Sequence, residues 1–465
     1  MALRPATLHP PRPPAAPVPA ALASLLLAAL AQWTLATNPG WFSHDELQWG
    51  ARAAASGPLP AVDWTALGAV QWRPLTFQLW LWLARALFAA PPAWHALWVL
   101  AGSANAALLA AVLVRLGSGH GVAVGAALVF ALGPYAVYVH GWVATLADLL
   151  VVAIGLGLAH GLASARGAPS AFASGRGWPA WQVASLAFAA TALALAAKES
   201  ALAFAPVLAL CWAAWPRPRV FAAATAGATT ACGLYLALRL PALLAAGAAE
   251  PAYALVPAQI PANWFAYHLF VPRTSTFEIA GLWRAPTGAL VLAAAFWSAL
   301  WTAVARAAGL RLALVLVLGG TLWLAPVLAI GMTANQYGYA FSAWCAALVA
   351  LAWPRLGRSA RVFVLVFAAL ALWHGANVQR GMRAAGERAA VFLPALAATL
   401  DAQPGRVRPL YLHAPPDEAW LYRRLTHQIP HWHGTVIADR VQLVDSADLA
   451  DHVITDSGTL EQREQ

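Results

Sequence analysis

The run VPAALASLLLAALAQWTLA at residues 18–36 carries no charge, and the segment WFSHDELQWG follows it at residues 41–50. A helix needs roughly 20 apolar residues to cross the hydrocarbon core of a bilayer, with ~17 as a lower bound. The first stretch therefore predicts a membrane-spanning helix. The second places two adjacent carboxylates, Asp45 and Glu46, just beyond that helix in a chain that is poor in acids.

The composition extends this interpretation to most of the chain. Of the 465 residues, 61% are hydrophobic and 10% are charged, whereas a soluble domain carries roughly 25% charged residues. The formal charge of +10 comes from arginines scattered between apolar runs, which argues against a nucleic-acid partner because no single basic patch forms. The three cysteines lie in apolar runs without a CxxC pair, so neither a disulfide nor a zinc site is predicted.

Apolar runs predict an all-α polytopic membrane protein with about 11 transmembrane helices. The runs are 18–36, 93–114, 120–139, 143–163, 181–197, 200–215, 220–240, 286–305, 311–331, 339–353 and 361–378. A shorter run at 75–90 contains Arg85 and ends at two prolines, so we predict an interfacial helix there. Residues 1–17 are predicted to be a disordered cytoplasmic tail. Residues 18–379 then form one transmembrane domain whose first periplasmic loop is 37–92.

The basic residues predict the orientation of this domain. With a cytoplasmic N-terminus, the short inside segments hold 12 of them, namely Arg4, Arg12, Arg115, Arg166, Arg176, Arg217, Arg219, Arg306, Arg311, Arg355, Arg358 and Arg361. The longer outside loops hold seven, namely Arg52, Arg73, Arg85, Lys198, Arg239, Arg273 and Arg284. An excess of basic residues marks cytoplasmic loops. We therefore predict a multi-pass protein of the bacterial inner membrane.

Acidic residues follow the opposite distribution. Before residue 386 there are seven, all outside or at outer ends of spans: Asp45, Glu46, Asp63, Asp148, Glu199, Glu250 and Glu278. Acids contribute little to insertion topology, so topology does not require this placement. Ordinary solvated loops are one explanation, and a functional site that faces the periplasm is the other.

The end of the chain has a different composition. Eleven of the 18 acids lie between Glu387 and Glu464. The stretches 408–414, 434–439 and 451–456 read as strands, and 416–425 reads as an amphipathic helix. Residues 380–465 are thus predicted to be a small periplasmic α/β domain. Its segment HQIPHWHG at 427–434 offers three histidines; an ordinary polar loop is favoured over a metal site, because no acid or cysteine stands at helical spacing beside them.

Several motifs occur in a fixed order along the first half of the chain. The pair Asp45-Glu46 is followed by WRPL at 72–75, by His95 and Asn105, by FALGPYAVYVHGWVATLADLL at 130–150, and by ALAAKESALAFAPVLAL at 194–210. This series resembles the GT-C superfamily of membrane glycosyltransferases, and most closely the transmembrane O-mannosyltransferases that carry tetratricopeptide repeats and their bacterial relatives. The resemblance covers about residues 18–215. The chain departs from the family pattern at Gly133, Tyr138 and Leu146, and no such repeats follow.

The resemblance implies transfer of a sugar from a polyprenyl-phosphate donor to a lipid, glycan or protein acceptor outside the membrane. Such a reaction needs a carboxylate base, groups that bind the phosphate, and an apolar groove for the lipid. Asp45 is the predicted base. Glu46 would orient the acceptor or share a divalent cation with Asp45. The alternative for this pair is a structural one, because Ser43 and Asp45 are good helix caps.

The remaining candidates are substrate-binding residues. Arg73 suits a phosphate because a guanidinium binds it through two hydrogen bonds; its alternative is contact with lipid headgroups. Asp148 lies at a depth where an acid is costly unless it is paired, so it is predicted to contact substrate or to pair with an arginine. Lys198 would be a second phosphate contact, or it would form an interfacial ion pair with Glu199, the other predicted substrate-binding residue of this turn; Tyr337 would touch the sugar.

Two other functional classes remain open at this point. A transporter or flippase for a lipid-linked glycan would need polar residues near the middle of the membrane. A catalytically inactive GT-C scaffold, which binds glycolipid or an envelope partner through its tail, would tolerate the departures from the family pattern.

Overall fold

The computed structural model describes residues 16–54, 61–69, 71–164, 178–215, 218–249, 254–268 and 287–462. The predicted disordered tail at 1–17 therefore lies almost entirely outside the described residues. Glu250 and Glu278, two of the acids before residue 386, lie outside them as well.

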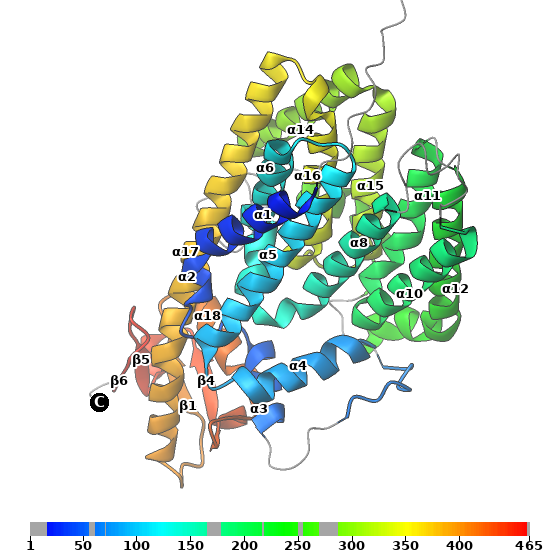
Figure 1. The fold of residues 1–465 in the computed structure, drawn as a ribbon. Coiled ribbons are helices and arrows are strands. Elements are labelled where there is room, and N and C mark those ends of the chain that lie inside the picture. The colour runs from blue at the N-terminus through cyan, green and yellow to red at the C-terminus, as the bar shows by residue number, and fades with distance from the viewer. Residues whose placement is uncertain are drawn as a thin grey trace, which may run out of the picture.

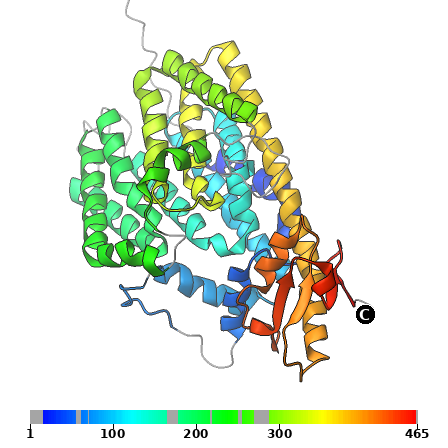
Figure 2. The same cartoon turned by 180° about the vertical axis from the view of Figure 1, so that it is seen from behind.

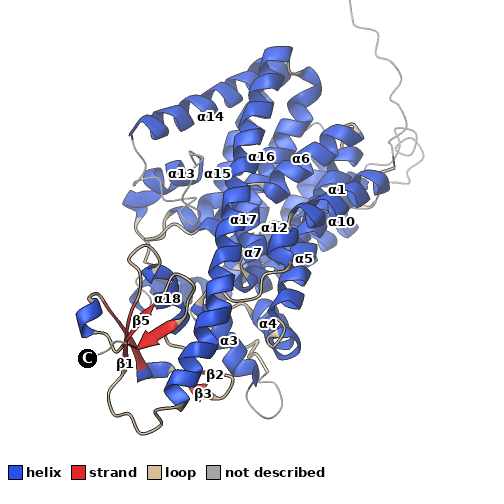
Figure 3. Cartoon of the chain, turned by 90° about the vertical axis from the view of Figure 1, so that its left-hand side faces the viewer, coloured by secondary structure: helices blue, strands red, loops and turns tan. Residues whose placement is uncertain are grey.

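The described chain is a bundle of apolar helices with a small α/β domain at one end (Figures 1 and 3). The bundle contains α1 (Val18–Ala31), α2 (Trp33–Ala36), α5 (Pro91–Arg115), α6 (His120–Leu132), α7 (Pro134–Gly141), α8 (Leu146–Ser164), α10 (Ala180–Ala197), α11 (Phe204–Ala214), α12 (Pro218–Ala249), α13 (Ile260–His268), α14 (Thr287–Ala308), α15 (Leu310–Leu328), α16 (Gly338–Ala352) and α17 (Arg358–Asp401). Each predicted apolar run is largely helical. The predicted fold class, an all-α membrane protein with a small α/β domain, is confirmed.

The number of spans depends on how short and bent helices are counted. Among the described residues, six helices are long and apolar enough to cross a membrane, and α6 with α7 makes a seventh if this pair is one span. The pair bends by 59° at Gly133. Gly133 is extended there because the proline that follows disfavours a helical conformation in the preceding residue. The count of eleven stays a prediction.

The last helix is longer than predicted. α17 runs for 44 residues from Arg358 to Asp401, so residue 380, the predicted start of the tail domain, lies inside it. Beyond residue 378 its buried residues recur every three or four positions, at Met382, Ala385, Ala389, Phe392, Leu396 and Leu400. This spacing is that of a helix with one apolar face. The helix therefore continues out of the bundle as an amphipathic support for the tail.

The tail contains a four-stranded sheet in the order β4-β1-β5-β6. Its strands are β1 (Leu410–His413), β4 (Val441–Val444), β5 (His452–Ile454) and β6 (Leu460–Gln462). β1 is parallel to β4 and β5, and β6 is antiparallel to β5. The helix α18 (Ala419–Thr426) matches its prediction. The segment 434–439 contributes only β3 (Thr435–Val436), which pairs with β2 (His431–Trp432) in a hairpin.

Two helices of the first loop cover one end of the bundle. They are α3 (His44–Ala54) and α4 (Pro74–Leu87), and α4 runs across that end below α8 and α10 (Figure 1). Thr76 Oγ1 donates to the carbonyl of Ala197 at 2.8 Å, and Trp80 Nε1 donates to that of Val143 at 2.9 Å. The tail strands lie at the same end, beside α3 (Figure 2). We call this the α3–α4 end of the bundle.

Candidate functional site

Asp45 and Glu46 begin α3 and have different surroundings. Glu46 is completely buried, and its Oε2 accepts hydrogen bonds from the N–H groups of Phe42 at 2.6 Å and Ser43 at 3.0 Å. Ser43 Oγ in turn accepts from the N–H of Asp45 at 3.3 Å. This reciprocal pattern is a capping box. It uses Glu46 to start the helix and leaves the Asp45 side chain 41% exposed.

The protonation of Glu46 follows from its burial. Burial raises the pKa of Glu46 to about 8, although the N–H groups of Phe42, Ser43 and Val143 act to lower it. At pH 7 this side chain is therefore mainly protonated, and the pair carries one negative charge rather than two. Among the described residues, no group of three or more His, Cys, Asp or Glu side chains is placed to hold a metal ion. The arrangement does not fit a divalent cation between Asp45 and Glu46, and we assign none.

The five predicted substrate-binding residues lie together: four of them form two ion pairs, and Tyr337 contacts the lysine of one pair. Lys198 Nζ donates to both carboxylate oxygens of Asp148 at 2.7 Å, and both side chains are buried. Arg73 binds both oxygens of Glu199, with Nε 2.9 Å from Oε2. Lys198 Nζ also lies over the ring of Tyr337, 4.7 Å from its centre. We call these five residues the ion-pair cluster.

The pairing within this cluster differs from one of the predicted alternatives. Lys198 and Glu199 do not pair with each other; each pairs with a residue distant in sequence. The reason is local, because the backbone of Lys198 is extended, with φ −163° and ψ 141°. In an extended chain successive side chains point to opposite sides. Asp148 has a lysine as its partner, where an arginine was the predicted structural alternative.

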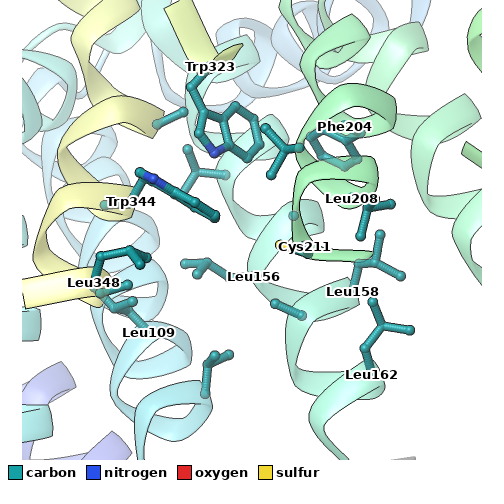
Figure 4. A pocket seen from close by; sticks show the side chains of 18 of the residues that line it. Leu109, Leu156, Leu158, Leu162, Phe204, Leu208, Cys211, Trp323, Trp344 and Leu348 are labelled. Atoms are coloured by element: carbon teal, nitrogen blue, oxygen red, sulfur yellow. The ribbon is translucent and has the colours of Figure 1, made fainter. Parts of the chain in front are cut away.

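Two cavities lie in this part of the bundle, and the smaller one adjoins the ion-pair cluster. A small one of about 20 Å³ is lined by polar side chains of Asp148, Ser200, Gln336, Tyr337 and Tyr339, and it has room for about one water molecule. An apolar cavity of about 240 Å³ lies beside it (Figure 4). The two share the wall residues Val152, Trp323 and Ala340.

The apolar cavity follows the helices toward the opposite end of the bundle. Its wall on α8 extends from Val152 to Leu162, a distance of about 15 Å along a helix. α5, α11, α12, α15 and α16 supply most of the remaining lining, which is almost entirely aliphatic and aromatic (Figure 4). A cavity of this length and composition, beside a small polar cavity, suits a hydrocarbon chain that carries a polar headgroup.

The α3 carboxylates and the ion-pair cluster lie at the same end of the bundle. α4 links them, because Trp80 packs against Trp49 of α3, with ring centres 5.7 Å apart, while Arg73 at the start of α4 holds Glu199. Asp45 does not line the small cavity beside Asp148. The carboxylate predicted to be the base thus lies at the same end of the bundle as the cluster but outside it.

The sequence analysis missed the tail residues that approach Asp45. The rings of His44 and His427 are 5.2 Å apart, and Arg424 lies over the rings of Phe42 and Trp142, 5.0 and 5.7 Å from their centres. Burial lowers the pKa of His44, with Arg424 and His427 adding to this and Asp45 opposing it. No pattern in one sequence connects residue 45 with residues 424 and 427, because the contact depends on how the tail docks.

A polar network within the bundle was not predicted from the sequence, although its member Asn105 belongs to the motif series. His140 bonds to Gln32 Oε1 at 2.7 Å and to the Tyr339 hydroxyl at 3.0 Å. Asn105 Nδ2 donates to the same hydroxyl at 3.1 Å and to the carbonyl of Leu149 at 3.1 Å. Gln32, inside the first apolar run, was the available signal. The network ties α5, α7 and α16 to the start of the chain.

Comparisons with known proteins found two similar solved structures. One is the crystal structure of ArnT from Cupriavidus metallidurans bound to undecaprenyl phosphate, with a TM-score of 0.46, 15% identity, and coverage of 92% of this chain and 86% of that chain. The other is a cryo-EM structure of the arabinofuranosyltransferase AftD from mycobacteria, with a TM-score of 0.43, 18% identity, and coverage of 92% of this chain and 30% of that chain. No protein-family model and no curated protein matches the chain.

Proposed function

We propose that the chain is a membrane glycosyltransferase that transfers a sugar from a polyprenyl-phosphate donor to an acceptor at the α3–α4 end of the bundle. The observation that carries the proposal is the apolar cavity of about 240 Å³ that shares three wall residues with the small polar cavity beside Asp148. The cavity suits the prenyl chain, and the nearby ion-pair cluster suits the phosphate. The motif resemblance to GT-C glycosyltransferases supports the same reaction.

In this proposal Asp45 is the general base. The acceptor hydroxyl loses its proton to Asp45 while its oxygen bonds to the anomeric carbon of the sugar. The bond between that carbon and the phosphate oxygen breaks, and its electron pair stays on the phosphate. Lys198 and Arg73 offset the negative charge that develops there. Asp148 and Glu199 then act as positioning residues, because each holds one of these cations through both carboxylate oxygens.

Replacement of the predicted base tests this function. Asp45→Asn keeps the size of the side chain and removes its basicity, so transfer is expected to fall by about 10²-fold or more. Transfer would be measured with labelled polyprenyl-phosphate hexoses and pentoses and with envelope extract as the acceptor. Asp63→Asn is the matched control, because Asp63 is an exposed acid of the same loop. Full activity of Asp45→Asn would remove Asp45 from the mechanism.

One observation favours a second candidate, a scaffold that binds glycolipid without catalysis. Both cations of the ion-pair cluster already have carboxylate partners, which is also what a purely structural cluster would show. If the protein is such a scaffold, it is expected to bind a polyprenyl phosphate but to transfer sugar from no donor. Mass spectrometry of envelope lipids and glycans from a strain without this protein separates the two, because only the enzyme would leave an acceptor that lacks its sugar.

A further inference from the structure

The tail domain docks on the first loop through one face of α18. Trp420 and Arg424 are four residues apart on this helix and so share a face. Both reach Phe42: the rings of Trp420 and Phe42 are 5.8 Å apart, and the guanidinium of Arg424 lies 5.0 Å from the centre of the Phe42 ring. Gln48 Nε2 of α3 also donates to the carbonyl of Gln428 at 3.2 Å. These contacts position α18 beside Asp45.

Arg424 differs from nearby arginines of the tail in having no carboxylate partner among the described residues. In the tail, Arg423 pairs with Asp445, while Arg406 and Arg408 pair with Asp451. Within the part of the chain that the structure describes, Arg424 forms no ion pair; its guanidinium lies over Phe42 and Trp142. Contacts with ring faces orient a guanidinium without neutralising its charge. Arg424 is half-buried, whereas Arg423 is exposed.

We propose that Arg424 binds an anionic phosphoryl group beside Asp45, so that the tail domain completes the site. The planar guanidinium matches phosphate oxygens through two parallel hydrogen bonds. Because burial favours the neutral form of Glu46, this carboxyl does not neutralise the guanidinium of Arg424. Burial also favours the neutral form of His44, so this ring adds no competing positive charge. The proposal rests on the proposed function, since it assigns Arg424 to the same reaction.

The ligand chemistry is a phosphate monoester or diester, and it has two possible sources. It is either the phosphate of the donor lipid or a phosphoryl group on a water-soluble acceptor. In the first case the electron pair of the broken sugar–phosphate bond stays on an oxygen that Arg424 contacts, while the acceptor proton goes to Asp45. In the second case Arg424 holds the acceptor so that its hydroxyl faces Asp45.

A binding experiment on the full chain tests the site without requiring transfer. The protein would be placed in phosphatidylcholine nanodiscs, and its affinity measured for undecaprenyl phosphate in one arm and for inorganic phosphate in the other. Arg424→Gln is expected to weaken binding in one arm by about tenfold or more, because charged hydrogen bonds are lost. Arg423→Gln, which removes the same charge one residue away, is expected to bind as the wild type does. Equal affinities of the two variants in both arms would overturn the proposal.

Chemical protection of the wild-type protein gives a readout that does not depend on how a variant folds. Phenylglyoxal modifies accessible arginines, and peptide mass spectrometry reports the modified positions. Bound phosphate or undecaprenyl phosphate is expected to protect Arg424 but not Arg423, and the ligand that protects identifies the source. Equal modification of Arg424 with and without both ligands would reject the site. Protection of Arg424 in a protein that shows no transfer with any donor would retain the site and reject the proposed enzyme.

Discussion

At the scale of single residues, Glu46 gives the protein a pH-dependent stability. Burial raises its pKa from an ordinary 4.5 to about 8, so the folded chain binds this proton more tightly than the unfolded chain does. The contribution to the free energy of unfolding is complete below pH 4.5 and is lost as the pH rises to about 8. Its full size is on the order of 5 kcal/mol.

Glu46→Gln should remove this dependence, because glutamine keeps an oxygen that accepts the two N–H groups and has no charge to bury. The thermal midpoint of the wild type in detergent is expected to fall between pH 5 and pH 8 relative to that of Glu46→Gln. Glu461→Gln, at an exposed position of the tail, is expected to leave the wild-type profile unchanged. Parallel profiles for Glu46→Gln and the wild type would contradict a raised pKa.

The sequence could identify the candidate residues but not their partners. A charge next to an apolar run is visible in one sequence, which is why Asp148, Lys198 and Arg73 were all selected. The pairing of residue 148 with 198 and of 73 with 199 depends on how α4, α8 and α10 meet. Adjacent charges such as Lys198 and Glu199 suggest a mutual ion pair only if the backbone between them is not extended.

At the scale of secondary-structure elements, the crossing of α17 with the α6–α7 bend depends on a glycine. A Cβ on Gly375 would lie 1.8 Å from the carbonyl oxygen of Leu132, which is far too close for two non-bonded atoms. Gly375→Ala is therefore expected to push α17 away from the bend and to lower stability by roughly 1–3 kcal/mol. The thermal midpoint and the yield of folded protein in detergent would show this.

Gly121→Ala is the matched control, because Gly121 is also helical and no atom lies within 4 Å of the position that a Cβ would take there. Alanine is the better helix former by about 1 kcal/mol, so this variant is expected to be as stable as the wild type or more so. If Gly375→Ala is as stable as Gly121→Ala, then α17 does not pack as closely on the α6–α7 bend as the structure describes.

Elements were predictable where one physical rule dominated. Long apolar runs became helices. Prolines stand at the starts of α4, α5 and α7, because proline suits the first helical position. No helix start was predicted from these prolines, however, and 120–139 was predicted as one unbroken span. The extension of α17 beyond residue 378 was missed since charges such as Arg383 and Glu387 suggested a soluble segment. Its apolar spacing was nevertheless present in the sequence. The strands β4 and β6 were not predicted, although they are as long as β1 and β5, which lie in predicted strand segments.

At the scale of the whole molecule, the helices place the candidate site residues, α3, α4 and the tail domain at one end of the bundle. The loop before α6 and the turn before α17 lie at the other end, where Arg115, Arg355 and Arg358 are found. Basic residues favour the cytoplasmic side. The α3–α4 end is therefore expected to face the periplasm, with the N-terminus in the cytoplasm.

Single cysteines in a background without Cys211, Cys232 and Cys345 test this orientation. Ala61→Cys and Val407→Cys lie at exposed positions of the first loop and the tail, and Gly119→Cys lies at an exposed position before α6. A membrane-impermeant maleimide added to intact spheroplasts is expected to label positions 61 and 407, and to label position 119 only after permeabilisation. Labelling of position 119 alone in intact spheroplasts would invert the topology. In that case Asp45 would face the cytoplasm and its acceptors would be cytoplasmic. Transfer at the periplasmic surface would then be rejected, even if the protein binds a lipid phosphate through its cavity, its ion pairs and Arg424.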